Sequence, residues 1–406
     1  MSIKTDPALV DEFLTRSIAE ILPSKDGLRE QLLSGRQLSF YVGIDPTADY
    51  VHLGHSTNYL ILERLHQMGH KIIVLVGDFT AMIGDPSDKT SMRVQLTPED
   101  VLENLKSFKQ QIGKILNFED TVNPIEFKFN STWLSKLTFI DTVELASNFT
   151  VQQMIDRDAF KKRIEAGKPL YVHEFFYPLM QGYDSVALDV DVEIGGTDQT
   201  FNMLAGRTLL KRFKNKEKFV IATTLLENPV TGEKLMSKSL GTGVGLDETA
   251  KSMFVKTMQL PDPGIMQCFV DCTRLPMTEI EAYRTQLSEG KNPRDVKLAL
   301  AEEIVRMYHG EEAAQKSRQE WLDQVSQKNV AEDVELYEVK SATLNIVDFI
   351  TEAAIADSKS KARRLIAQGA VRVNNERIED SIEEITPVNG DILRIGKKHT
   401  FKLVVA

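Results

Sequence analysis

The stretch YVGIDPTADYVHLGHS, residues 41–56, overlaps the end of an apolar run at residues 38–44 and leads into a second apolar pattern at residues 57–67. The first run is typical of a short buried strand, whereas Leu60, Ile61 and Leu65 in the second recur at helical spacing. The sequence therefore predicts a strand, a loop and a helix. The loop combines histidines, aspartates and glycine or proline breakers, a mixture that calls for a chemical explanation.

Three further runs indicate a parallel sheet. Residues 72–79, IIVLVGDF, are continuous and β-branched, as in a strand covered on both faces. Residues 190–196 and 219–226 fit as further strands of the same sheet. Strand, helix and strand in succession predict an α/β, doubly wound (Rossmann-like) parallel-sheet domain at residues 1–246. The mainly helical character of about 95–180 predicts an insertion between its two halves.

The remaining segments predict a helical lead-in and two further domains. Residues up to about 36 are predicted to be helical from the spacing of Leu9, Phe13, Ile18, Ile21 and Leu22 before Pro23. Residues 247–340 have a helical period and predict an α-helical domain. Residues 341–406 combine two short helices with the alternating VRVNNERI and a final KLVV strand, which predicts a small α+β module.

Composition limits the class of protein. The chain has 406 residues, of which 42% are hydrophobic and 27% charged, and a net charge of -10. No apolar run approaches the roughly 20 residues needed to cross a bilayer, so we expect a cytoplasmic protein that does not bind membranes. Cys268 and Cys272 lack a second ligand pair, so no structural metal is expected. The negative charge disfavours a surface coated for nucleic acid but leaves room for a local basic face.

His52 and His55 lie at the start of the predicted helix. A helix N-terminus offers free backbone N–H groups and the positive end of the dipole, and Gly54 lets a ligand approach the backbone. Two imidazoles and the hydroxyl of Thr47 can donate to phosphate oxygens. The alternatives are surface histidines or a metal pair, but no carboxylate completes an HExxH arrangement. A nucleotide is the favoured ligand.

A second phosphate-binding pattern follows the last predicted strand of the sheet. EKLMSKSLG, residues 233–241, places Lys234 and Lys238 among serines and ends on a glycine. Such a loop can close on a polyphosphate and bring positive charge to the transition state. The alternative is a solvated turn, because exposed lysine is common.

HLGH at 52–55, followed far downstream by LMSKS at 235–239, resembles the HIGH and KMSKS signatures of class I aminoacyl-tRNA synthetases. YVGIDPTAD, IGDPS at 83–87, FFYPLMQGYD at 175–184 and IGGTDQ at 194–199 resemble motifs of the tyrosyl-tRNA synthetase family. The resemblance covers essentially the whole chain, and the last module is similar to an S4-type RNA-binding domain. It implies activation of L-tyrosine with ATP and Mg²⁺, transfer to tRNA(Tyr), and a homodimer formed through the insertion.

The resemblance also implies a role for individual residues. The expected tyrosine-binding residues are Tyr41 and Asp184 at the phenol hydroxyl, Asp85, Tyr177 and Gln181 at the ammonium, and Gln199. The expected ATP-binding residues are Gly43, Asp45, Gly54, Gly196, Asp198, Lys234 and Ser239. The expected catalytic residues are Thr47, His52, His55 and Lys238.

The physical logic of a tyrosine pocket agrees with these roles. Tyr177, Gln181 and Asp184 follow helical spacing, so one helix face would present all three, although a solvated face has the same pattern. Two polar partners for the phenol hydroxyl would be left unpaired by phenylalanine, and tyrosyl enzymes are themselves the standard example of this effect. Without the resemblance, a buried hydroxyl pair or a helix-surface residue would be the favoured interpretation of Tyr41 and Asp184.

The sequence departs from the family pattern at three positions. Leu235 replaces the first lysine of KMSKS, so it is open whether Lys234 acts in its place. Thr200 replaces a tryptophan found in one branch of the family, and Glu193 precedes IGG. These departures indicate a different bacterial branch.

The last module carries basic residues that we expect to contact RNA phosphates: Lys359, Lys361, Arg363, Arg364 and Arg372. A solvated basic face is the alternative. Three other functions are also open: a tryptophanyl enzyme, a synthetase-like RNA-binding protein without catalysis, and a generic nucleotidyltransferase. Pyrophosphate exchange and dependence on tRNA would separate them.

Overall fold

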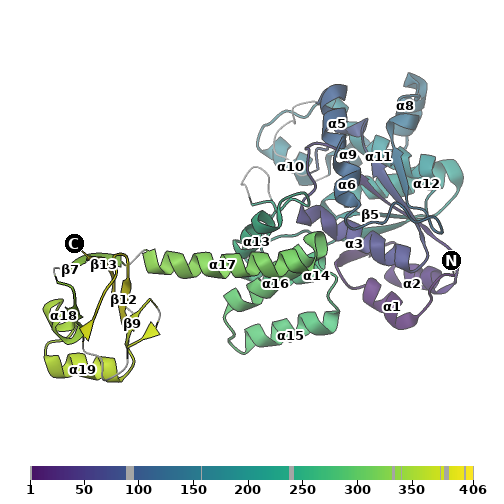
Figure 1. The fold of residues 1–406 in the computed structure, drawn as a ribbon. Helices are drawn as coiled ribbons and strands as arrows, with labels where there is room; N and C mark the ends of the chain where they lie inside the picture. Colours follow the sequence, from purple (N-terminus) through teal and green to yellow (C-terminus); the bar gives the residue numbers. More distant parts are fainter. Residues whose placement is uncertain are drawn as a thin grey trace. The chain divides into compact units, whose positions relative to one another are not determined.

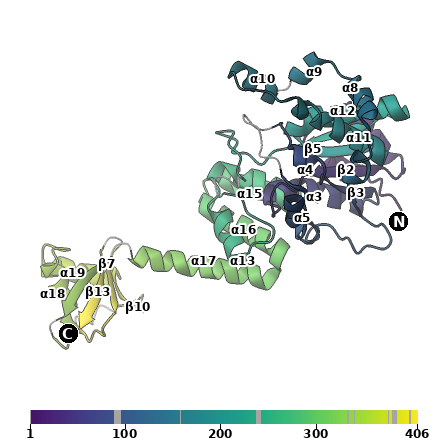
Figure 2. The same cartoon turned by 90° about the horizontal axis from the view of Figure 1, so that it is seen from above.

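The computed structural model describes residues 2–87, 96–156, 158–236, 242–331, 334–339, 341–374, 376–378, 384–396 and 399–405. The chain divides into two compact units, Met1–Ser317 and Arg318–Ala406. Figures 1 and 2 show the elements of each unit. None of the helices in these ranges combines the length and apolar character needed to cross a bilayer.

The first unit is built on a six-stranded sheet with the order β1-β6-β5-β2-β3-β4. The strands are β1 (Ile18–Leu22), β2 (Ser39–Ile44), β3 (Lys71–Val76), β4 (Glu126–Phe129), β5 (Val192–Gly196) and β6 (Phe219–Thr223). All neighbours pair in parallel except β1 and β6. From β2 the chain adds β3 and β4 toward one edge of the sheet, and from β5 it adds β6 toward the other edge. The boundary between β2 and β5 is therefore the topological switch point, where such sheets bind ligands.

Helices cover both faces of this sheet. Before and within the sheet region the helices are α1 (Pro7–Phe13), α2 (Lys25–Leu33), α3 (Leu53–Gln67), α4 (Thr80–Ile83), α11 (Tyr177–Leu188) and α12 (Thr200–Lys214). The helix α3 connects β2 to β3, and α12 connects β5 to β6, which lies on the other side of the switch point. Right-handed crossovers in these two opposite directions across the sheet place the helices on opposite faces, as Figure 1 shows. The strands are accordingly apolar and buried, and β5 is buried over its whole length. The predicted fold class is confirmed.

The insertion is mainly helical, as expected. It contains α5 (Pro98–Leu105), α6 (Phe108–Ile112), α7 (Ser131–Leu134), α8 (Phe139–Ala146), α9 (Val151–Ile155), α10 (Asp158–Glu165) and the 3₁₀ helix η1 (Val172–Phe175). Figure 2 shows α8, α9 and α10 along one end of the first unit. Large apolar side chains are exposed on α8, with Phe139 at 85% and Ile140 at 71%.

Two strands of the first unit's sheet were not predicted. The apolar spacing at Ile18, Ile21 and Leu22 was read as helical, but these residues form β1, which pairs antiparallel with β6 at the sheet edge. A five-residue segment offers too few residues to separate the two periods, so tertiary pairing decides. The strand β4 lies inside the segment expected to be helical and pairs with β3.

A helical part completes the first unit. It contains α13 (Ala250–Met258), η3 (Asp262–Gly264), α14 (Ile265–Cys272), α15 (Met277–Ser288), α16 (Pro293–His309) and the start of α17 (Glu311–Ala331). The helix α14 packs against α3, and Cys268 and Cys272 are buried free thiols. The helical part therefore supports the helix that carries the two histidines.

The second unit contains a five-stranded sheet of order β10-β9-β12-β13-β7. Its elements are β7 (Val334–Val339), β8 (Leu344–Asn345), α18 (Ile346–Glu352), α19 (Lys359–Ala367), β9 (Val371–Val373), β10 (Glu376–Arg377), β11 (Glu384–Ile385), β12 (Ile392–Ile395) and β13 (His399–Val405). The ring of Phe349 meets those of Tyr337 and Phe401 edge to face in the core. Because β7 pairs with β13, this sheet includes residues N-terminal to the expected boundary at 341.

Candidate functional site

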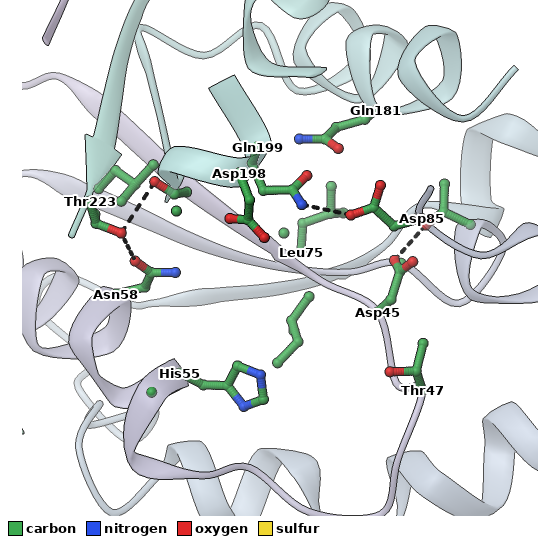
Figure 3. Close-up of a pocket in the computed structure, with 18 of the residues that line it drawn as sticks. Asp45, Thr47, His55, Asn58, Leu75, Asp85, Gln181, Asp198, Gln199 and Thr223 are labelled. Carbon is green, nitrogen blue, oxygen red and sulfur yellow. Dashed lines mark hydrogen bonds between the residues drawn. The ribbon is translucent and has the colours of Figure 1, made fainter. Parts of the chain in front are cut away.

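A cavity of about 1050 Å³ opens at the carboxyl ends of β2 and β5. Its walls come from those strand ends, the first turn of α3, α11 and the loop after β6. It is lined by the predicted site residues Gly43, Asp45, Thr47, His52, Gly54, His55, Asp85, Tyr177, Gln181, Asp184, Gly196, Asp198, Gln199 and Lys234. Figure 3 shows His55 and Thr47 on one side, with Gln181, Gln199 and Asp85 across from them. The predicted residues Lys238 and Ser239 lie outside the described residues.

The N-terminus of α3 holds two stacked imidazoles. His52 is the N-cap, and its Nδ1 accepts from the backbone N–H of Gly54 at 3.1 Å. Nδ1 of His55 accepts from the backbone N–H of His52 at 3.3 Å. The ring centroids are 3.7 Å apart. With both Nδ1 atoms acting as acceptors, each neutral ring carries its proton on Nε2.

Burial keeps both rings neutral. It lowers the pKa of His52 to about 4. It also lowers the pKa of His55 well below the usual value, and the neighbouring His52 adds to that shift. A charged ring would lose solvation and the Nδ1 acceptor together. The site therefore offers N–H donors, not fixed cations, at this helix end.

Carboxylates gather at a second region of the cavity. Asp45 accepts from the hydroxyls of Tyr177 at 2.9 Å and Thr80 at 2.7 Å. Asp85 accepts from the Gln199 amide at 2.6 Å. Hydroxyl and amide donors hold both carboxylates at the cavity wall, a position that suits a cationic group such as an ammonium.

Tyr41 and Asp184 are buried polar groups next to the cavity. The Tyr41 side chain is 1% exposed, and its hydroxyl lies 2.9 Å from Ser185 Oγ. Asp184 accepts from Trp133 Nε1 at 2.7 Å and from Asn130 Nδ2 at 3.3 Å. Burial raises the pKa of Asp184 well above its usual value, and these two donors oppose the shift. Tyr41 lies behind the cavity wall, whereas Asp184 forms part of it.

Several residues around this deep region were not predicted. Trp133 and Asn130 come from the insertion, far from the quoted motifs, and only the fold brings them to Asp184. Ser185 carries no sequence signal beyond its place next to Asp184. Glu193 was noted only as a departure from the family pattern. Lys218 precedes a buried strand, which gave no reason to expect it under the cavity.

The loop after β6 brings Lys234 to the cavity but not Leu235. Lys234 lines the cavity, and its backbone forms a β-bridge with Glu227. Leu235 is 5% exposed, and its Cδ1 would lie 2.7 Å from a Cβ at Gly264. The residue at the first lysine position of KMSKS therefore packs against the helical part.

In the second unit, the predicted RNA-binding residues lie on α19 and β9. Lys359, Lys361, Arg363, Arg364 and Arg372 are all exposed. Lys359 pairs with Asp348 and Lys361 with Asp357, each at 2.6 Å. Such exposed pairs are weak and do not prevent contact with a phosphate.

The described residues hold no group of three or more histidine, cysteine, aspartate or glutamate side chains placed to bind a metal.

Comparison with known proteins covers both units. The family "tRNA synthetases class I (W and Y)" matches residues 33–324, and "Tyrosine--tRNA ligase SYY-like C-terminal domain" matches residues 326–403. Tyrosine–tRNA ligase 2 of Clostridium acetobutylicum is 42% identical over 97% of this chain and 98% of its own. Tyrosine–tRNA ligase of Haemophilus influenzae is 41% identical over 97% and 96%.

Solved structures show the same fold. A C-terminally truncated mitochondrial tyrosyl-tRNA synthetase of Aspergillus nidulans gives a TM-score of 0.66 at 22% identity, covering 78% of this chain and 94% of that one. Tyrosyl-tRNA synthetase of Archaeoglobus fulgidus complexed with L-tyrosine gives 0.61 at 22% identity, covering 77% and 100%.

Proposed function

The chain belongs to the class I tRNA synthetases of the tryptophan and tyrosine type, and we propose that its cavity joins L-tyrosine to tRNA(Tyr) in two steps. It is a tyrosine–tRNA ligase, as are its curated relatives at 37% to 42% identity over nearly the whole chain. The observation that carries the proposal for this cavity is that it combines two imidazole N–H donors at a helix N-terminus with a deep pair of polar groups. The imidazole donors suit a phosphate, and the pair of polar groups suits a phenol.

We propose that the amino acid lies between the deep pair and the carboxylates. Tyr41 and Asp184 would bond the phenol hydroxyl, and an analogue without that hydroxyl would leave them unpaired. Asp85, Tyr177 and Gln181 would hold the ammonium. The 2.6 Å bond between Gln199 and Asp85 supports this arrangement, because it directs Asp85 toward the cavity.

The first step needs charge stabilisation more than proton transfer. The tyrosine carboxylate is already ionised and attacks the α-phosphorus of ATP, so no general base is required. Thr47, His52 and His55 would donate to phosphate oxygens as pyrophosphate departs, and Lys238 would join them from the loop after β6. Asp45, Gly43, Gly54, Gly196, Asp198, Lys234 and Ser239 would line the nucleotide site. ATP would enter as its Mg²⁺ complex, with the ion on its phosphates.

The second step transfers the tyrosyl group to the 3′-terminal ribose of tRNA(Tyr). We propose that residues 1–246 catalyse both steps, that 247–340 contact the anticodon, and that the S4-like residues 341–406 bind RNA backbone. A homodimer through the insertion would cover the exposed apolar side chains of α8. The cytoplasm, where tRNA is charged, is the proposed location.

The test is amino-acid-dependent exchange of labelled pyrophosphate into ATP without tRNA, comparing tyrosine, phenylalanine and tryptophan. Exchange with tyrosine alone is expected. Exchange with tryptophan and not with tyrosine would show that the cavity activates tryptophan, and the proposed specificity would be wrong. A folded chain that exchanges with none of the three but binds tRNA would be a synthetase-like RNA-binding protein.

A further inference from the structure

A buried ion pair joins Glu193, which lines the cavity, to Lys218, which does not. Lys218, the residue before β6, is fully buried, and its Nζ donates to Glu193 Oε2 and to Ser185 Oγ, the latter at 2.8 Å. Glu193 is itself 2% exposed. A Cβ at Gly206 on α12 would lie 2.5 Å from both Lys218 Nζ and Ser185 Oγ. The glycine therefore leaves the space that the lysine occupies.

Stability alone does not account for this pair. Burial lowers the pKa of Lys218, and Glu193 opposes that shift, so the two charges depend on each other. Apolar residues of similar volume are often as stabilising as a buried ion pair, since both ions must lose their water. The pair also contacts residues at the cavity, because Glu193 bonds Gln181 and Lys218 bonds Ser185 next to Tyr41.

Glu193 orients one wall residue of the cavity. Its Oε1 accepts from Gln181 Nε2 at 3.1 Å. A carboxylate accepts hydrogen bonds and does not donate them, so the amide nitrogen of Gln181 must face Glu193. The carbonyl oxygen of Gln181 is then turned away from Glu193, which suits a residue that accepts from an ammonium.

Lys218 holds a second set of hydrogen bonds through Ser185. An ammonium donates only, so Ser185 Oγ accepts from Lys218 and has one proton to give. Its distance to the Tyr41 hydroxyl is 2.9 Å, against 3.3 Å to Glu193 Oε2. Either oxygen of the shorter contact can be the donor, and in both cases Ser185 links Lys218 to the Tyr41 hydroxyl.

We propose that Lys218 and Glu193 are positioning residues for the tyrosine pocket. A chain of hydrogen bonds runs from Lys218 through Ser185 to Tyr41, whose hydroxyl would meet the phenol oxygen of the substrate beside Asp184. Neighbouring bonds in such a chain polarise one another. This inference rests on the proposed function and adds Lys218, Glu193 and Ser185 to the residues that shape the tyrosine pocket.

The first test is Ser185→Ala, which cuts the chain and leaves the ion pair in place. Pyrophosphate exchange is measured with tyrosine and with phenylalanine. The ratio of kcat/KM for tyrosine to that for phenylalanine is expected to fall roughly 10-fold, mostly through KM for tyrosine, since the bond acts before and during the reaction. A purely structural role would lower the melting temperature and leave this ratio unchanged.

Thr257→Val is the matched control, because Thr257 is also a buried hydroxyl and bonds only the Met253 carbonyl among the contacts described, at 2.8 Å. It should leave the ratio as in the wild type. Lys218→Met should lower the ratio as Ser185→Ala does, and the double variant should lose little more, since both break one chain. If Lys218→Met does not fold, Ser185→Ala decides alone.

An unchanged ratio in a folded Ser185→Ala variant would overturn the inference. That result differs from failure of the proposed function, in which the wild type itself would show no tyrosine-dependent exchange.

Discussion

The imidazole rings of His52 and His55 stack with their centroids 3.7 Å apart and their planes 15° from parallel. Each Nδ1 accepts a backbone N–H at the start of α3, so the two rings share in capping the helix. Protonating either ring would remove an acceptor from the cap and place a charge against its neighbour. The same contacts thus hold the donors for phosphate and make the site sensitive to acid.

Acid should destabilise the protein through these rings. His52 has a pKa of about 4 in the folded chain against a usual 6.5, so the unfolded chain binds more protons between these values. The contribution of His52 to the free energy of unfolding should therefore be greatest above about pH 6.5 and should fall as the pH drops toward 4. Urea unfolding near pH 7.5 and near pH 5 measures this loss.

His52→Asn is the informative variant for that measurement. Asparagine keeps an acceptor for the Gly54 N–H, which makes it a good N-cap, but it does not titrate. The variant should lose less stability than the wild type between the two pH values, with His55 accounting for part of what remains. An equal loss in both proteins would show that His52 is not the titrating group.

Trp133 should control the ionisation of Asp184. Its Nε1 donates to Asp184 at 2.7 Å and opposes the rise in pKa caused by burial. In Trp133→Phe the pKa of Asp184 should rise further, and the acid limb of kcat/KM for tyrosine should move to higher pH. The pH profile of pyrophosphate exchange measures this, with roughly a 10-fold loss expected near neutrality.

Trp321→Phe makes the same substitution at the chain's other tryptophan, on α17, and should leave the profile unchanged. A Trp133→Phe enzyme with a lower kcat/KM but an unmoved acid limb would mean that Asp184 stays ionised without the indole.

Sequence reasoning predicted the repeating parts of the fold and the residues in short motifs. The strands β2, β3, β5 and β6 lie in the middle of the sheet, where burial on both faces leaves a clear pattern. The strands β1 and β4 are the two edge strands and are less buried, so only their partners in the sheet distinguish them from helix. His52, Asp85 and Asp184 were predicted because each lies in a recognisable motif. Lys218 and Trp133 act through distant contacts that no local pattern records.

The basic residues of the second unit should affect transfer and not activation. Arg364→Gln with Arg372→Gln removes two exposed charges from α19 and β9. The KM for tRNA in aminoacylation should rise, and the slope of log affinity against log salt should fall by about 2, since each phosphate contact releases about one counterion. Pyrophosphate exchange without tRNA should be unchanged.

Lys4→Gln with Lys25→Gln is the matched pair, because it removes the same charge from exposed lysines at the N-terminus of the chain. It should leave the salt slope as in the wild type. An equal effect of both pairs would mean that net charge matters and that the face on α19 and β9 is not specific.

Lys234 should supply the charge that the family motif places one residue later. Its side chain lines the cavity, whereas Leu235 is buried against the helical part. Lys234→Met should lower kcat for pyrophosphate exchange by about 10²-fold with less change in the KM for ATP, if the lysine acts on charge that develops in the transition state. Lys25→Met, on the surface, should have no effect.

A swapped variant, Lys234→Leu with Leu235→Lys, restores the family order and tests the direction of the side chains. The new lysine would replace a buried leucine that packs against Gly264, so it should not recover kcat and should lower the melting temperature. Recovery of kcat by the swap would contradict the proposed role of Lys234, because it would show that position 235 can reach the phosphates.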